Sequence, residues 1–193
     1  MIDRLSSIFP AHRRVDTNHA APLLFHCESI RMVAATADAV FAHLDDHNRL
    51  AGHMSQSSWL MAGSKMSIEL DAAKGRATGS HIHLRGRVLG IPIHVEEVVT
   101  KHEPPLRKAW KTIKVPKLLV IGHYTMGFDI KPKGASSLVR VFIYYDLPEA
   151  WLPRLLGHLL GGFYARWCTE SMAKDAAAYF TPSALQKPRN RAA

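Results

Sequence analysis

The chain has 193 residues, of which 47% are hydrophobic and 21% charged, and this balance excludes a disordered or fibrous protein. At this length we expect a single domain around one well-buried core. The net charge of +9 is not gathered into runs of bases interleaved with aromatic residues, so no nucleic-acid partner is expected, and a weak peripheral contact with an anionic membrane stays open.

The first elements are read from alternation and capping signals. Residues 1–22 contain two prolines and predict a loosely ordered lead-in. Apolar and polar residues alternate over 23–34, which predicts the first strand. Thr36 then suits the N-cap of a helix, since its hydroxyl can accept a hydrogen bond from the first turn. A second short helix is expected near 48–54.

Six further strands follow from period-two alternation of apolar and polar residues. They cover 66–71, 80–88, the segment after Pro92, 107–115, 122–130 and 138–146. Lys133-Gly134-Ala135 supplies the turn between the last two.

The hairpin after residue 88 predicts a register. With Gly90 and Ile91 at the centre of a type II′ turn, Arg85 lies opposite Glu96 on the outer face. The same register turns Glu97 inward, opposite Leu84. A carboxylate at this position is either inside the protein or displaced by a β-bulge, and both readings stay open.

A helix of about thirty residues closes the folded region, beginning between Pro148 and Pro153 because proline is tolerated only in a first turn. Its large apolar residues recur at helical spacing and are expected to face the sheet. Three glycines, at 157, 161 and 162, either allow close helix-to-sheet packing or leave room for a ligand. The tail, 181–193, is expected to be basic and disordered.

Cysteine usage and hydropathy indicate the compartment. Cys27 and Cys168 show no metal-binding or redox spacing, which favours a reducing cytoplasm. Residues 1–14 lack the apolar run of an export signal. The apolar segment 151–167 is interrupted by two arginines and a histidine, so it should not span a bilayer. A cytoplasmic protein is therefore expected.

This order of elements resembles the helix-grip fold of the START-like (SRPBCC) superfamily, in its bacterial polyketide cyclase/dehydrase and lipid-transport branch. The resemblance covers about 23–180 and is clearest in GHYTMGFDIKP (122–132), VFIYYDLP (141–148) and FYARWCTESMAKDAAAYF (163–180). It implies an α+β fold in which a seven-stranded, curved antiparallel sheet wraps around a long C-terminal helix, with one or two short helices after the first strand. It also implies a binder or carrier of hydrophobic molecules, but no shared catalytic residue.

Metal and nucleophile chemistry find no support in the sequence. His43 and His47 stand four residues apart, and His81 and His83 share a strand face, but zinc needs three or four convergent ligands. Solvent-facing histidines explain both pairs, so no metal and no cofactor are assigned. There is also no GxSxG motif. No catalytic residue is assigned, and the inward titratable candidates for acid/base chemistry are Glu97, Tyr124 and Tyr145.

Alternation alone predicts which residues line the space between sheet and helix. The predicted ligand-binding residues are Ile82, Leu84, Trp110, Tyr124, Met126, Phe128, Val141, Ile143, Tyr145, Leu156, Leu159, Phe163 and Trp167.

Three functional hypotheses follow from these residues. The first is binding or transport of a lipid, polyketide or quinone-like molecule. The second is a polyketide cyclase or dehydratase that uses Glu97 and a tyrosine. The third is an interaction module whose outer row, consisting of His81, His83, Arg85 and Arg87, meets an acidic partner or a membrane.

Overall fold

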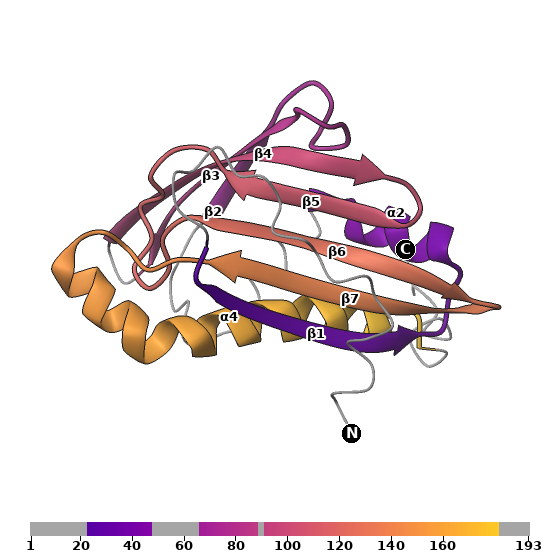
Figure 1. Ribbon diagram of the computed structural model, residues 1–193. Coiled ribbons are helices and arrows are strands. Elements are labelled where there is room, and N and C mark those ends of the chain that lie inside the picture. Colours follow the sequence, from indigo (N-terminus) through magenta and orange to yellow (C-terminus); the bar gives the residue numbers. More distant parts are fainter. Residues whose placement is uncertain (1–22, 48–65, 89–90, 182–193) are drawn as a thin grey trace, which may run out of the picture.

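The computed structural model describes residues 23–47, 66–88 and 91–181. Within these ranges the chain forms seven strands and two helices (Figure 1). The elements are β1 (Phe25–Val33), α2 (Ala37–Leu44), β2 (Met66–Leu70), β3 (His81–Val88), β4 (Ile91–Glu103), β5 (Arg107–Thr112), β6 (Tyr124–Lys133), β7 (Ser136–Tyr145) and α4 (Trp151–Tyr179).

The strands form one antiparallel sheet in the order β1-β7-β6-β5-β4-β3-β2. The predicted α+β fold, with a seven-stranded antiparallel sheet and a long closing helix, is confirmed. Gly134, at a φ of 65°, turns the chain between β6 and β7 as predicted. The second short helix expected near 48–54 lies outside the described residues, as do the lead-in 1–22 and most of the basic tail.

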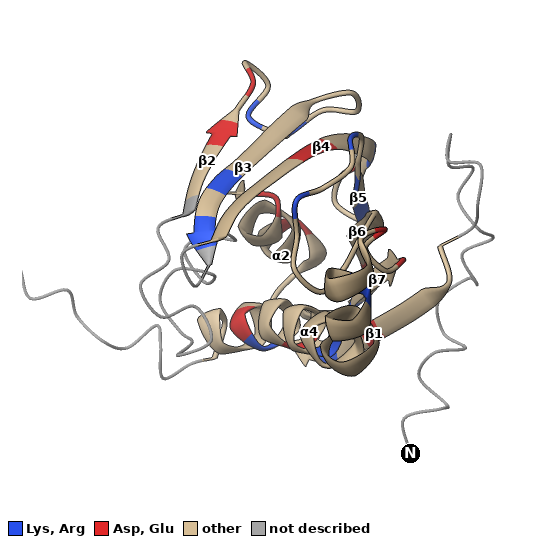
Figure 2. Cartoon of the chain, turned by 90° about the vertical axis from the view of Figure 1, so that its left-hand side faces the viewer, with Lys and Arg blue, Asp and Glu red and all other residues tan. Residues whose placement is uncertain are grey.

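Both helices lie on the concave side of the sheet. α4 packs along β1 and β7, while α2 packs on β6 and β7 and touches α4. Figure 2, turned by 90°, shows the sheet curving around α2 with α4 along its lower side. No helix within the described ranges is long and apolar enough to cross a membrane.

The inner face of the sheet carries most of the core, as alternation requires. Fully or nearly fully buried side chains from five strands point toward the helices: Ile82, Val95, Val99, Trp110, Met126, Phe128, Val141 and Ile143.

The β3–β4 register differs from the predicted one by two residues. Arg85 pairs with His94 rather than Glu96, and Glu97 pairs with Ile82 rather than Leu84. The centre of the hairpin therefore falls one position earlier than predicted. A shift of two keeps every side chain on its predicted face, because successive side chains alternate.

The packing face of α4 is the main correction to the sequence analysis. Leu156, Leu159 and Phe163 were expected to face the sheet, but they are exposed, and Trp167 is only partly buried. Small residues face the sheet instead, at spacings of three and four: Gly157, Gly161, Ala165, Thr169, Ala173 and Ala176.

Close approach explains why α4 packs through small residues. A Cβ atom at Gly157 would lie 2.8 Å from the Val120 carbonyl oxygen, and one at Gly161 would lie 3.0 Å from the same atom. The helix backbone thus rests directly on the segment before β6, where no larger side chain fits. Of the two readings of these glycines, close packing is the one found at 157 and 161.

The outer face of β6 and β7 is also more buried than alternation predicted. By alternation Arg140 and Phe142 of β7 stand on the face turned away from the helices, where exposure to solvent is ordinary, yet both are buried. Arg140 donates to Asp129 with Nη2 at 2.6 Å, and the Phe142 ring lies over Gly127, where a Cβ atom would be 2.8 Å from it. An aromatic ring covering a strand glycine fills the space that the glycine leaves.

Candidate functional site

A buried carboxyl group lies on the inner face of β4. Glu97 follows Val95 and precedes Val99 on this face, and only 4% of it is exposed. The Tyr124 hydroxyl of β6 donates a hydrogen bond to its Oε1, and the Trp110 indole of β5 makes a second. Of the two readings of this residue, the inward one describes the structure, because the β4 bulge falls later, between Val99 and Lys101.

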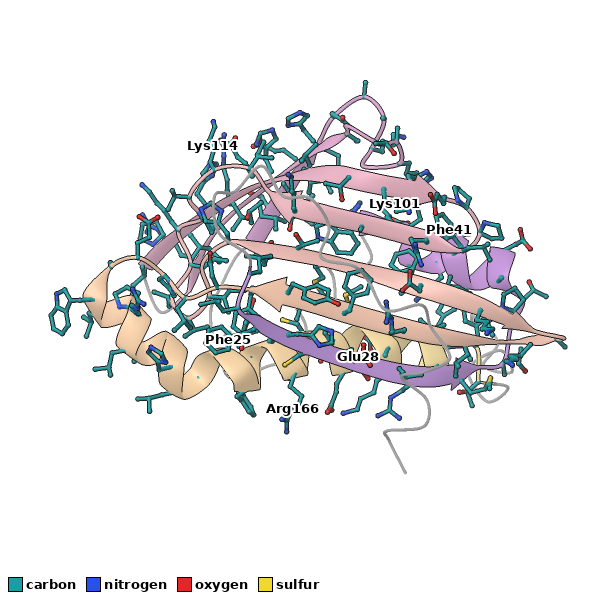
Figure 3. The ribbon with its side chains drawn as sticks, viewed as in Figure 1. Phe25, Glu28, Phe41, Lys101, Lys114 and Arg166 are labelled. Atoms are coloured by element: carbon teal, nitrogen blue, oxygen red, sulfur yellow. The ribbon has the colours of Figure 1, made fainter. Side chains whose placement is uncertain are left out.

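Burial makes this carboxyl titrate near neutrality. Desolvation raises the pKa of Glu97 from 4.5 to about 7, although the hydrogen bonds from Tyr124 and Trp110 and the charge of Lys108 oppose the rise. The adjacent Glu96 points outward and accepts a hydrogen bond at 2.9 Å from Lys114, which lies at the upper edge of Figure 3. Two neighbouring glutamates therefore have opposite environments.

Tyr124 keeps its proton over the whole physiological range. Burial, followed by the nearby Glu97 carboxylate, raises the Tyr124 pKa well above its ordinary value of 10. Its backbone is fixed by β5, because the Tyr124 amide donates to the Thr112 hydroxyl at 3.2 Å. A protonated phenol beside a carboxyl that can gain or lose a proton is suited to hydrogen-bond and proton-transfer chemistry.

The helix contributes two groups that the sequence analysis did not select. Tyr164 and Cys168 lie one turn apart on α4 and hydrogen-bond to each other. Both influence the ionisation of Tyr124, which places them toward the buried carboxyl. Burial raises the Cys168 pKa to about 12, so this thiol stays protonated and is no nucleophile. The helical spacing could have indicated both residues, because positions 164 and 168 lie next to the row of small residues through which α4 packs on the sheet.

A buried ion pair forms a second polar group on the same side of the sheet. Lys108 of β5 is fully buried and donates to the Asp45 carboxylate at the end of α2. His102 of β4 contacts the same carboxylate at 3.2 Å, and Arg76 approaches it at 3.9 Å. Desolvation lowers the Lys108 pKa, and Asp45 opposes that shift.

Sequence reasoning also missed Lys108, although alternation contained the signal. Lys108 stands two residues before Trp110 and therefore shares its inner face. Lysine is almost never fully buried without a partner, so the residue type at this position argues for solvent even though the alternation argues for the interior. Asp45, some sixty residues away in sequence, is the partner that only the folded chain reveals.

His47 is the third buried group here. It is 5% exposed, and its ring meets the Trp110 indole edge-to-face with centroids 5.6 Å apart. Desolvation, followed by the charge of Lys108, lowers its pKa to about 4, so the imidazole is neutral at pH 7. His43 is buried too and stacks on Tyr179. The prediction that this histidine pair faces solvent was wrong.

The structure brings together most of the strand residues predicted to line the interior. The buried ones are Ile82, Trp110, Tyr124, Met126, Phe128, Val141, Ile143 and Tyr145. Leu84 is partly buried and packs against this core. The described residues contain no group of three or more histidine, cysteine or acidic side chains placed to hold a metal.

Comparisons with known proteins show the fold. No family model and no curated protein matches the sequence. Among solved structures, a protein from Thermus thermophilus is 14% identical, with a TM-score of 0.57, and 81% of this chain and 99% of that one are covered. The aromatase/cyclase Zhui from a Streptomyces species has the same identity and TM-score, with 82% and 97% covered.

A plant enzyme is similar to a comparable degree. Norcoclaurine synthase from Thalictrum flavum is 15% identical, with a TM-score of 0.56, and 90% of this chain and 97% of that one are covered. At such identities the likeness concerns the fold alone. The chain shares with these structures a helix-grip fold, in which a curved antiparallel sheet packs on a long C-terminal helix.

Proposed function

We propose that the protein binds a hydrophobic small molecule, of the lipid, polyketide or quinone-like kind, between the inner face of the sheet and α4. The observation that carries the proposal is the Glu97–Tyr124 pair, buried on the inner face among apolar side chains such as Val95 and Val99. A core built only for stability would favour apolar side chains here, because burying a carboxyl group is unfavourable even when it is hydrogen-bonded. The pair instead suits the polar group of an apolar ligand.

Native mass spectrometry and solvent extraction of the purified protein test the proposal. We expect a retained apolar molecule that is released on denaturation. Enclosing the body of such a molecule contributes about 25 cal/mol per Å² of apolar surface, which supports micromolar binding after association costs.

Enlarging a side chain on the inner face gives a sharper test. Met126→Trp should weaken binding of the probe anilinonaphthalene sulfonate at least about tenfold, because the indole takes the ligand's space. Met32→Trp, at an exposed position of β1, is the matched control. If the interior is solid, Met126→Trp overpacks it and lowers stability by about 1–3 kcal/mol. That result, with no extracted molecule, would contradict the proposal.

A second candidate function is acid/base catalysis on a polyketide-like substrate, as in a cyclase or dehydratase. It is favoured by one observation: a carboxyl group with a pKa of about 7 accepts a hydrogen bond from Tyr124. A group that titrates near the working pH is the best placed to accept and return a proton. The likeness to an aromatase/cyclase supports this reading at the level of fold.

The test compares adjacent glutamates on a synthetic poly-β-ketone thioester, with loss of water followed by mass. Glu97→Gln should lower the rate by about 10²–10⁴, whereas Glu96→Gln, on the outer face, should leave it unchanged. The wild-type rate should also depend on pH with an apparent pKa near 7. A rate equal in both variants would exclude Glu97 as the acid/base group.

A further inference from the structure

Three acidic side chains are buried within the described ranges, and one of them lacks a cation. Asp129 pairs with the Arg140 guanidinium at 2.6 Å. Asp45 pairs with the Lys108 ammonium. Glu97 is held instead by neutral donors, and the charge of Lys108 is the weakest of the influences on it. Among the described residues, Glu97 is therefore the buried acid that no cation contacts.

Without a cation in contact, the Glu97 carboxyl group avoids a buried charge by keeping its proton. Burial raises its pKa to about 7, so the acid form predominates below that pH. The Tyr124 hydroxyl donates to Oε1 of Glu97, and this bond does not use the proton of the acid itself. A protonated carboxyl group has an O–H donor, so the pair has one donor left for a ligand.

The groups around this carboxyl are neutral as well. The cluster comprises Trp110 on β5, Tyr124 on β6, and Tyr164 and Cys168 on α4. Burial raises the pKa of Tyr124, and the neighbouring Cys168 that of Tyr164, well above the ordinary value of 10. Burial also raises the Cys168 pKa to about 12. All three groups therefore keep their protons, and none supplies a charge for an ionised ligand group.

The interior next to this cluster is only partly covered by side chains. α4 packs along β1 and β7, at the other end of the sheet from β3 (Figure 2). Leu84 of β3 and Tyr164 and Cys168 of α4 pack against the core but are only partly buried. Their remaining exposed surface is the part that an apolar ligand would cover on binding.

We propose that the bound molecule is an apolar ketone or quinone, and that its carbonyl oxygen accepts a hydrogen bond from the protonated carboxyl group of Glu97. This inference rests on the proposed function and names the polar group of its ligand. A carbonyl oxygen accepts hydrogen bonds and carries neither a charge nor a proton, so it matches a site with a spare O–H donor and no cation. A ligand carboxylate would be left without a counter-ion, and a ligand ammonium would require Glu97 to ionise.

Equilibrium dialysis of the wild-type protein against three molecules with the same ring system tests the proposal. These are 1-tetralone, which has a carbonyl group, tetralin, which has none, and 1-aminotetralin, which is a cation at neutral pH. At about pH 5.5 we expect 1-tetralone to bind about fivefold more tightly than tetralin, because one hydrogen bond is added. At about pH 8.5 this preference should be lost, because the ionised carboxyl group no longer donates.

Three substitutions assign the preference to the carboxyl proton. Glu97→Gln keeps an N–H donor that does not titrate, so it should retain the preference at both pH values. Glu97→Met has a similar length but no donor, so it should bind 1-tetralone and tetralin equally at both. Glu96→Gln, on the outer face, should behave like the wild type. A purely structural role for Glu97 would change thermal stability in the Glu97 variants but not the ligand preference.

Two results would overturn this inference and leave the proposed function standing. One is equal binding of 1-tetralone and tetralin by the wild type at the lower pH. The other is tightest binding of 1-aminotetralin that strengthens toward the higher pH, since Glu97 would then act as an ionised counter-ion. If none of the three molecules binds, the proposed function fails as well.

Discussion

Replacing Lys108 by methionine is expected to destabilise the protein by about 3 kcal/mol. Methionine keeps the length and apolar stem of the side chain but removes its ammonium group. Among the described residues, the buried Asp45 carboxylate then keeps His102 and the more distant Arg76 as its partners. Removing one member of a buried ion pair typically costs about 3–5 kcal/mol, and these remaining partners place the value at the lower end.

A double-mutant cycle measured by urea denaturation checks this prediction. Lys108→Met with Asp45→Asn should recover part of the lost stability, since no buried charge is left without its partner. Lys174→Met is the control, because Lys174 forms an exposed pair with Glu170 at 2.7 Å, and such helix pairs are worth about 0.3–0.5 kcal/mol. A loss below about 1 kcal/mol for Lys108→Met would show that the pair contributes little to the folded state.

The stability of the protein relative to Glu97→Gln is expected to fall by about 3 kcal/mol between pH 5 and pH 8. The pKa of Glu97 is 4.5 in its ordinary state and about 7 in the folded protein. Below 4.5 both states hold the proton. As pH rises, the unfolded chain ionises first, so the folded state loses stability until its own carboxyl ionises near 7. Each pKa unit is worth about 1.4 kcal/mol.

Chemical denaturation of both proteins across this range provides the measurement. Taking the difference between wild type and Glu97→Gln removes groups common to both, among them His47, whose pKa is lowered to about 4. Glu96→Gln should show no such fall, because the pKa of that outward-facing carboxyl is lowered rather than raised. A flat difference for Glu97→Gln would mean that Glu97 titrates like a solvent-exposed glutamate.

Strand alternation predicted the sheet well because it depends only on neighbouring residues. It placed Tyr124, Met126 and Phe128 on the inner face, where they lie. Register depends on the turn as well, and with Leu89-Gly90 and Gly90-Ile91 both available as turn centres the sequence did not distinguish them. The error of two residues left every side chain on its predicted face. It did give Glu97 the wrong partner, which is Ile82 in the structure and not Leu84.

The helix was harder to predict because hydrophobicity and burial disagree along it. Leu159 and Phe163 have the spacing of a core-facing row, yet the close approach of α4 to Val120 admits only small residues such as Gly161. How near two elements come is a property of the whole fold. The Lys108–Asp45 pair could not be predicted for the same reason, since a buried charge is acceptable only once its distant partner is known.

The position of β1 at the edge of the sheet also has a consequence for how the chain folds during synthesis. β1 pairs only with β7 among the described strands, and β7 ends about 110 residues later in the chain. At about 5–20 residues per second, the ribosome needs roughly 6–20 s to deliver that partner. α4 also packs on β1, so β1 has neither its pairing strand nor its helix until the chain is nearly complete. The last steps of folding are therefore non-local and slow.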